Sequence, residues 1–343
     1  MAYAGVFEIA QKRGYKFANI TGVSVGGVAG VCAAAGLKTQ EMLKIIDEFS
    51  LPKVDSDKIP EKVPAVKRVM KVINKSVKHD ENIIKSFLLM GEDADLTDFA
   101  DLYEKLLDLK DYRMNLIKNI LEYSKKGSLF DGDYLEEWMA KLLARKGIRT
   151  FADLRGGVKD AKNPNGYKVR MTAVDCNRMK VIVLPDDISY YGIDPDKLEV
   201  AKAIRMTTCV PFAFKPVEIK RNDGDKIKTH YIVDGGVFDR LPSWLLENSE
   251  KCPVVAFVLE GKGDKGLFSI NTPLAVFKAL VSAVHDIGIP KNWDSGLKYV
   301  GKIDVGDIHA LDFDIDKDKR KYLYESGKKT ALSLFNELEK SLK

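Results

Sequence analysis

The feature that most constrains the fold is a glycine-framed serine, G-V-S-V-G at residues 22–26, where a short apolar run meets a run of small residues. Residues 17–23 have the composition of a short strand, and residues 25–35 have the small side chains of a closely packed helix that Gly36 ends. A strand that turns directly into a helix is a building unit of α/β folds. Glycines on both sides leave room for a strained turn with the serine at its tip. The pattern predicts an α/β body organised around Ser24.

A serine in this position is a candidate nucleophile. The helix that follows directs its free N–H groups and the positive end of its dipole towards any oxyanion formed there, so the backbone N–H of Val25 is a candidate donor. Gly22 and Gly26 complete the nucleophile elbow. Taken alone the pentapeptide is a weak signal, and the alternative is a turn that only allows close packing of helix on sheet. It does not match the phosphate-binding loops, because Ser24 stands where G-x-G-x-x-G requires its second glycine.

A serine hydroxyl needs a base, and Asp234 is the carboxylate in the strongest position. It follows an apolar strand at 230–233 and precedes Gly235 and Gly236, where the backbone can turn sharply away. Without Ser24, an ordinary Asp-Gly turn would be the better interpretation. Of the four histidines, His230 opens the same strand and is more typical of a structural residue. The other three lie in charged, polar or loop-like surroundings: His79, His285 and His309. None follows an orienting carboxylate in the order serine, aspartate, histidine.

Composition excludes several other classes of protein. The four cysteines lie far apart with no C-x-x-C pair, so neither a disulfide framework nor a zinc site is indicated, and we expect no metal and no cofactor. The 55 Lys and Arg exceed the 50 Asp and Glu by only 5, which does not indicate a nucleic-acid partner. No run of ~18 apolar residues predicts a transmembrane helix. Charged residues interrupt the N-terminal apolar stretch, which argues against a signal peptide. We therefore expect a cytoplasmic protein.

The chain is expected to form one domain, residues 1–343, in which residues 38–126 are a helical insertion or cap. Its stretch at 66–77 combines an apolar stripe with several lysines, which suits either a helix on an anionic membrane surface or a core-facing helix with solvated lysines. The remaining pattern predicts helices at 3–13, 131–146, 198–205 and 328–342, and strands at 167–173, 180–184, 230–233 and 254–259, the first two of these strands pairing with each other.

The serine and aspartate motifs together resemble the patatin-like phospholipases. Further similar segments lie at 3–7, 128–132, 171–175, 203–205, 211–214 and 237–242, so the resemblance covers most of the chain outside 38–126. It implies a patatin-like three-layer α/β/α fold with a central, mostly parallel sheet. It also implies hydrolysis of a lipid acyl ester by a Ser24–Asp234 dyad through an acyl-enzyme, with Gly235 and Gly236 as the supporting turn. The expected partners are a lipid or acyl-ester substrate and, peripherally, the membrane.

One departure from the family pattern leaves alternatives open. Members carry a glycine-rich G-G-G-x-x-G loop whose N–H groups form the oxyanion hole, and this loop would lie just before residues 2–5, where the sequence has no counterpart. Loss of a single donor of this kind costs roughly 10²–10³ in rate. A truncated reading frame or a degraded member with impaired activity is therefore expected. The alternatives are a Ser-His-Asp esterase that uses His230 or another histidine, a catalytically silent lipid-binding or scaffold protein, and an inactive, poorly folded fragment.

Overall fold

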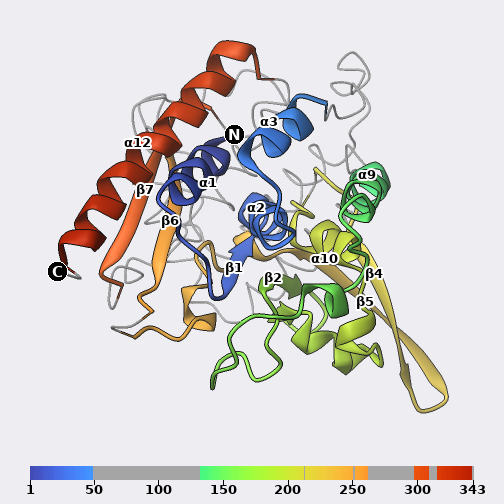
Figure 1. The fold of residues 1–343 in the computed structure, drawn as a ribbon. Coiled ribbons are helices and arrows are strands. Elements are labelled where there is room, and N and C mark those ends of the chain that lie inside the picture. The colour runs from blue at the N-terminus through green and yellow to red at the C-terminus, as the bar shows by residue number, and fades with distance from the viewer. Residues whose placement is uncertain (49–131, 212, 250–251, 262–296, 309–314, 342–343) are drawn as a thin grey trace, which may run out of the picture.

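The computed structural model describes residues 1–48, 132–211, 213–249, 252–261, 297–308 and 315–341 (Figure 1). Its larger sheet has five strands: β1 (Ile20–Val23), β2 (Val169–Asp175), β3 (Lys180–Leu184), β4 (Val217–Asp223) and β5 (Lys226–Asp234). A smaller sheet pairs β6 (Val255–Gly261) with β7 (Tyr299–Gly306). The α-helices described are α1 (Ala2–Lys12), α2 (Val25–Ala34), α3 (Thr39–Glu48), α9 (Asp133–Ala144), α10 (Val200–Thr207) and α12 (Lys317–Ser341).

Strand β2 is the strand on which the larger sheet is assembled, and all its side chains are buried. β3 pairs with residues 171–175 of β2 and so occupies one side of it. β1 pairs in parallel with residues 169–172, and β5 pairs antiparallel with residues 173–175. A strand can pair along only two edges. β1 and β5 therefore share the second edge of β2, and their carboxyl ends meet there.

The predicted α/β class is confirmed, but the sheet is mixed where we expected a mostly parallel one. Among the described strands, β1–β2 and β6–β7 are parallel, whereas β2–β3, β2–β5 and β4–β5 are antiparallel. For two of the three antiparallel pairs, the reason lies in the connections. β2 and β3 are joined by residues 176–179, and β4 and β5 by residues 224–225. Connections this short allow only antiparallel neighbours, because a parallel crossover needs a dozen residues or more.

Small residues allow the helices to lie close against the sheet. Helix α2 packs on β1 and β2, and a Cβ atom added at Gly30 would lie 3.0 Å from Cγ2 of Ile20. Helix α10 packs on α9, β2 and β5. Its fully buried Ile204, together with Met171 of β2 and Met139 of α9, belongs to the main hydrophobic core. This core holds β2 and α10 in a fixed relation to one another.

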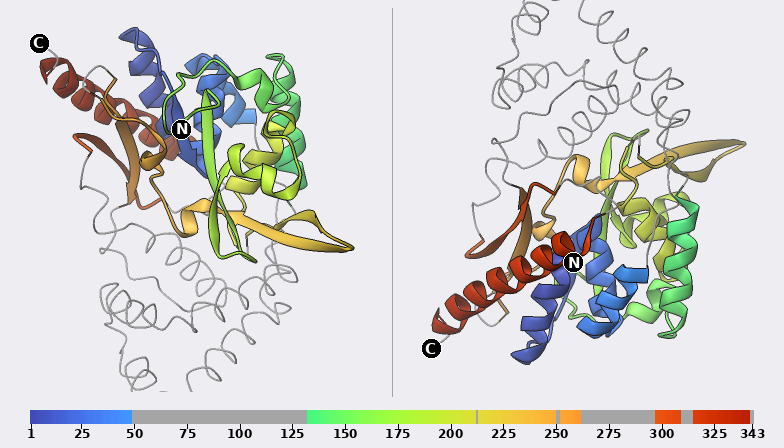
Figure 2. Two further views of the ribbon diagram at one scale, coloured as in Figure 1. Left: turned by 90° about the horizontal axis from the view of Figure 1, so that it is seen from below. Right: turned by 90° about the horizontal axis from the view of Figure 1, so that it is seen from above.

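Helices α1 and α12 lie side by side in every view, with α12 along β7 (Figures 1 and 2). Their contact is made by glycines. A Cβ atom added at Gly327 of α12 would overlap the carbonyl oxygen of Ala2, and one added at Gly5 of α1 would overlap that of Tyr324. Because both overlaps are with backbone atoms, a larger side chain at either position must push the two helices apart.

We therefore expect Gly327→Ala to destabilise the protein by about 1–3 kcal/mol, the usual effect of overpacking. In an exposed helix the same change would stabilise by up to about 1 kcal/mol, so the sign of the effect is diagnostic. Denaturant unfolding measures it. Lys329→Ala, at an exposed position of the same helix, is the control and should change the free energy of unfolding by less than about 0.5 kcal/mol. A Gly327→Ala protein as stable as wild type would contradict this account of the helix contact.

Most of the predicted insertion at 38–126 lies outside the described residues. The structure describes its first helix, α3, while residues 49–126, with the basic stretch at 66–77 and His79, are not among those described. In the part of the chain that is described, no helix combines the length and the apolar character needed to cross a bilayer. The prediction of a single domain with a helical cap stays a prediction.

Candidate active site at the meeting point of two strands

Ser24 lies at the turn between β1 and α2, with backbone angles of φ 52° and ψ −127°. A positive φ is uncommon for a residue with a side chain, and such strain is concentrated at functional sites. Residue 22 must be glycine because the start of α2 leaves no room for a side chain there. A Cβ atom there would lie 2.5 Å from the carbonyl carbon of Gly26 and 2.7 Å from the nitrogen of Gly27. The strand and the first turn of the helix therefore approach as closely as the predicted elbow requires.

The surroundings of the elbow are open on the helix side. Val25 is the first residue of α2 and is 56% exposed. The first N–H groups of a helix have no acceptor within it, which makes this end suited to negative charge. A Cβ atom at Gly26 would meet only the hydroxyl oxygen of Tyr3, at 3.8 Å. Burial raises the pKa of Tyr3 to about 12, against a lowering by the nearby Arg240, so the phenol keeps its proton at neutral pH.

Asp234 is the last residue of β5 and is 1% exposed. Its Oδ1 accepts a hydrogen bond of 2.7 Å from the backbone N–H of Gly236, which closes a short 3₁₀ turn, and its own N–H donates to the carbonyl of Cys209 at 2.9 Å. A Cβ atom at Gly235 would lie 2.6 Å from the carbonyl oxygen of Thr172. The two glycines thus hold the predicted supporting turn tightly against β2.

The strand register brings the two predicted residues together. Val23, directly before Ser24, is opposite Thr172, and Asp234 is opposite Ala173, the next residue of β2. β1 and β5 occupy the same edge of β2. Ser24, the residue directly after β1, therefore follows that strand at the point where β5 ends with Asp234. The main chains of two residues about 210 positions apart in sequence therefore lie at the same point of this edge.

Residues 207–209, at the carboxyl end of α10, contact both Ser24 and Asp234, although no sequence motif marks them. The hydroxyl of Thr207 accepts a hydrogen bond of 2.9 Å from the N–H of Ser24 and donates one of 2.7 Å to the carbonyl of Thr172. Two residues later, Cys209 accepts from the N–H of Asp234. Burial raises the pKa of the Cys209 thiol, with a contribution from Asp234, so this neighbour is uncharged. Thr207 and Cys209 lie between two segments that resemble the family, 203–205 and 211–214, but they belong to no motif themselves.

His230 is held elsewhere in the sheet. It is four residues before Asp234 in β5, which at ~3.3 Å per residue is roughly 13 Å along the strand. Its Nδ1 lies 2.8 Å from Oδ2 of Asp175, which also accepts a hydrogen bond of 2.7 Å from the hydroxyl of Tyr191. The histidine thus has an orienting carboxylate, but at a distance from the elbow. His79, His285 and His309 lie outside the described residues.

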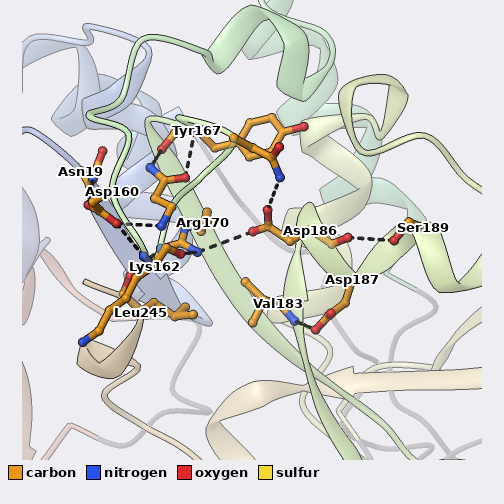
Figure 3. A network of polar contacts seen from close by, with 12 residues as sticks. Asn19, Asp160, Lys162, Tyr167, Arg170, Val183, Asp186, Asp187, Ser189 and Leu245 are labelled. Carbon is orange, nitrogen blue, oxygen red and sulfur yellow. Dashed lines mark hydrogen bonds and ion pairs between the residues drawn. The ribbon is translucent and has the colours of Figure 1, made fainter. Parts of the chain in front are cut away.

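Arg170 of β2, which is 4% exposed, binds the segment that follows Asp234 through the carbonyl of Leu245 (Figure 3). Its guanidinium donates to the carbonyl of Lys162 at 2.6 Å and to that of Leu245, and lies 3.6 Å from Oδ2 of Asp186. A buried arginine needs such partners, since an unpaired charge is costly in the interior. The contact with Leu245 fixes the chain that leads away from the supporting turn.

No group of three or more His, Cys, Asp or Glu side chains within the described ranges is arranged to hold a metal ion.

Comparisons with known proteins identify the family of this chain. A model of the patatin-like phospholipases matches residues 1–246, more than half of the chain. The uncharacterized protein YqhO of Bacillus subtilis (strain 168) is 27% identical over 334 residues, which cover 96% of this chain and 91% of the relative. The crystal structure of VipD from Legionella pneumophila is similar with a TM-score of 0.46 at 15% identity; the match covers 98% of this chain and 64% of that one. The chain thus belongs to the patatin-like phospholipase family, and its general class of function is lipid hydrolysis.

Proposed function

We propose that this protein cleaves a carboxylic ester of a lipid, with Ser24 as nucleophile and Asp234 as its general base. The observation that carries the proposal is the register on β2, which puts the elbow and the end of β5 opposite the consecutive residues Thr172 and Ala173. A nucleophile and a base must approach within ~2.6–3.2 Å for proton transfer, and neighbouring strand ends are the arrangement that allows it.

The reaction proceeds in two halves. Asp234 takes the proton of the Ser24 hydroxyl while the oxygen attacks the ester carbonyl, and the oxyanion forms beside the first N–H groups of α2, including that of Val25. The bond from the carbonyl carbon to the alkoxy oxygen then breaks, and the Asp234 carboxyl returns its proton to the leaving alcohol. In the second half Asp234 takes a proton from water, the hydroxide attacks the acyl-enzyme, and Ser24 leaves with that proton as the fatty acid is released.

The surroundings of Asp234 suit this role. An ordinary aspartate has a pKa of about 3.9 and is a weak base at neutral pH. The proposed site compensates through alignment, because a fixed geometry removes much of the entropic cost of bringing the reactants together. The bond from Gly236 to Oδ1 orients the carboxylate, and its near-complete burial limits competing water.

A lipid surface is the proposed partner, contacted peripherally by a cytoplasmic protein. Two exposed apolar side chains follow the site residues closely in the sequence: Val25 directly after Ser24, and Phe238, 42% exposed, four residues after Asp234. The charge balance still gives no reason to propose nucleic acid as a partner. The prediction that turnover is impaired without the glycine-rich loop stays a prediction, which a rate measurement on the 343-residue chain tests.

Covalent labelling with a fluorophosphonate probe tests the nucleophile. We expect one equivalent of label at Ser24, located by peptide mass spectrometry, because an activated serine attacks phosphorus as it attacks a carbonyl. Ser24→Ala should lose the label. Ser333→Ala, far along the chain in α12, should keep it.

The outcome also separates the remaining candidates. A folded protein that binds lipid vesicles without labelling at Ser24 would be a catalytically silent lipid-binding or scaffold member. Labelling that depends on His230 in place of Asp234 would indicate a Ser-His-Asp esterase.

A further inference from the structure

The hydroxyl of Thr207 has one proton and two neighbours in the buried interior. It lies 2.7 Å from the carbonyl oxygen of Thr172 and 2.9 Å from the backbone nitrogen of Ser24. A carbonyl can only accept and an N–H can only donate. The hydroxyl therefore donates its proton to the carbonyl of Thr172 and accepts a hydrogen bond from the N–H of Ser24. Thr207 itself is fully buried. Its hydroxyl therefore forms a fixed link from the elbow to β2.

This link acts on the most strained backbone of the elbow. Ser24 has φ 52° and ψ −127°, and a non-glycine residue in a sparsely populated conformation costs about 1–3 kcal/mol. Such a conformation persists only where the surroundings over-determine it. The N–H of Ser24 points at Thr207, and leaving a buried N–H without its acceptor costs about 1–3 kcal/mol more. The hydrogen bond thus favours the strained conformation over relaxed ones.

The hydrogen bond from Thr207 to the carbonyl of Thr172 also relates the position of Ser24 to that of Asp234. It is opposite Val23, directly before Ser24, and its carbonyl is packed against Gly235, directly after Asp234. The same peptide of β2 is thus in contact with the segments that carry both side chains. A hydroxyl that ties Ser24 to this peptide sets the position of the serine relative to the carboxylate.

The chain leaves room for Thr207 to approach so closely. A Cβ atom at Gly27 would lie 3.2 Å from Cγ2 of Thr207 and 3.5 Å from Cβ of Met171, so a side chain at this point of α2 would displace the threonine. Thr208, its neighbour in sequence, makes a different contact. Its hydroxyl donates to the carbonyl of Ile204 at 2.7 Å within the same helical segment.

We propose that Thr207 is a positioning residue, whose hydroxyl holds the backbone of Ser24 in the elbow conformation and so aims its side chain at Asp234. The inference rests on the proposed function of Ser24. Thr207 does not touch the reacting atoms; it acts through the main chain of the nucleophile.

The test compares Thr207→Val with Thr207→Ser. Valine keeps the volume but removes the hydroxyl, and a misplacement of about 1 Å costs on the order of 10²-fold in rate. We expect kcat for a short-chain acyl ester, and the rate of fluorophosphonate labelling, to fall by about that factor, with KM changed less than about threefold. Serine restores the hydroxyl and should recover most of kcat. Thr208→Val, which leaves the Ser24 contact intact, should behave as wild type.

Two results would overturn the proposal. One is an unchanged kcat in Thr207→Val. The other is an equal loss in the valine and serine variants that follows the fraction of unfolded protein, which would show a structural role only.

Failure of the underlying function gives a different pattern. If the wild-type protein neither hydrolyses esters nor reacts with the probe, the proposed function fails. Hydrogen exchange at the Ser24 amide then still decides on Thr207: faster exchange in the valine variant than in the serine variant supports the link to the elbow, and equal exchange refutes it.

Discussion

Asp234→Asn is expected to lower kcat/KM for acyl esters by about 10²–10⁴-fold, the usual contribution of a general base. Asparagine preserves the shape of the side chain, and its oxygen can still accept the hydrogen bond from Gly236, so the supporting turn should persist. What is lost is the capacity to take the proton of Ser24. Steady-state kinetics and the rate of fluorophosphonate labelling measure the effect, and thermal unfolding establishes that the variant is folded.

Two matched variants make this result specific. Asp239→Asn changes a half-buried carboxylate five residues further on, which accepts bonds from the N–H of Leu241 and the indole of Trp244, and activity should stay within a few-fold of wild type. His230→Gln removes one of the hydrogen-bond partners of the buried Asp175 and should lower stability, with activity per folded molecule retained. Should the histidine variant abolish acyl release while Asp234→Asn is active, the dyad is wrong and a histidine-dependent esterase replaces it.

Gly22→Ala is expected to remove most activity, by about 10²-fold or more, through the shape of the elbow alone. The added methyl group would lie 2.5 Å from the carbonyl carbon of Gly26 and 2.6 Å from its oxygen. Neither backbone atom can turn aside as a side chain can, so β1 and the start of α2 must separate. Ser24 moves with them and its alignment with Asp234 is lost. The same kinetic assays read the effect.

Gly26→Ala is the comparison for folding. A methyl group there would contact only the hydroxyl of Tyr3, at 3.8 Å, so its free energy of unfolding should be close to that of wild type, while Gly22→Ala should be less stable. If Gly22→Ala retains full turnover, the close approach of strand and helix has no part in positioning the serine.

Local sequence predicted the parts of the fold that are determined locally. The elbow at Ser24, the pairing of β2 with β3, and helices α1, α2 and α9 follow from short-range patterns of apolar and small residues and match the structure closely. The junction of β1 and β5 could not be derived in this way. It depends on a register between strands far apart in sequence, and no local pattern specifies which edge of β2 each strand occupies.

Three elements were missed or misjudged for identifiable reasons. β4 contains mostly charged residues after Ile219 and is a strand because it pairs with β5; the Asp223-Gly224 turn, with φ 63° at Gly224, was its available signal. β7 has its buried residues in partial alternation, including Tyr299 and Ile303, and this alternation was its available signal. α12 begins at Lys317, well before the predicted residue 328, because Gly327 suggests a helix end but instead makes the contact with Ala2.

The sequence indicated the candidate catalytic residues of the site but not the residues that surround and position them. Ser24, Asp234 and their glycines were identified by motif, and the structure places them around one point of β2. Thr207 and Tyr3 were not identified, because a buried threonine and a helix-terminal tyrosine have no distinctive spacing. Their relation to the elbow exists only in three dimensions.

The end-to-end meeting of β1 and β5 has a consequence for biosynthesis. A ribosome adds Asp234 about 210 residues after it has completed the strand, elbow and helix around Ser24. Nascent chains, and fragments that end before β5, would therefore carry the serine without its proposed activator. Under the proposed mechanism, the ability to attack lipids would arise only when β5 pairs with β2, which ties the onset of activity to the assembly of the five-stranded sheet.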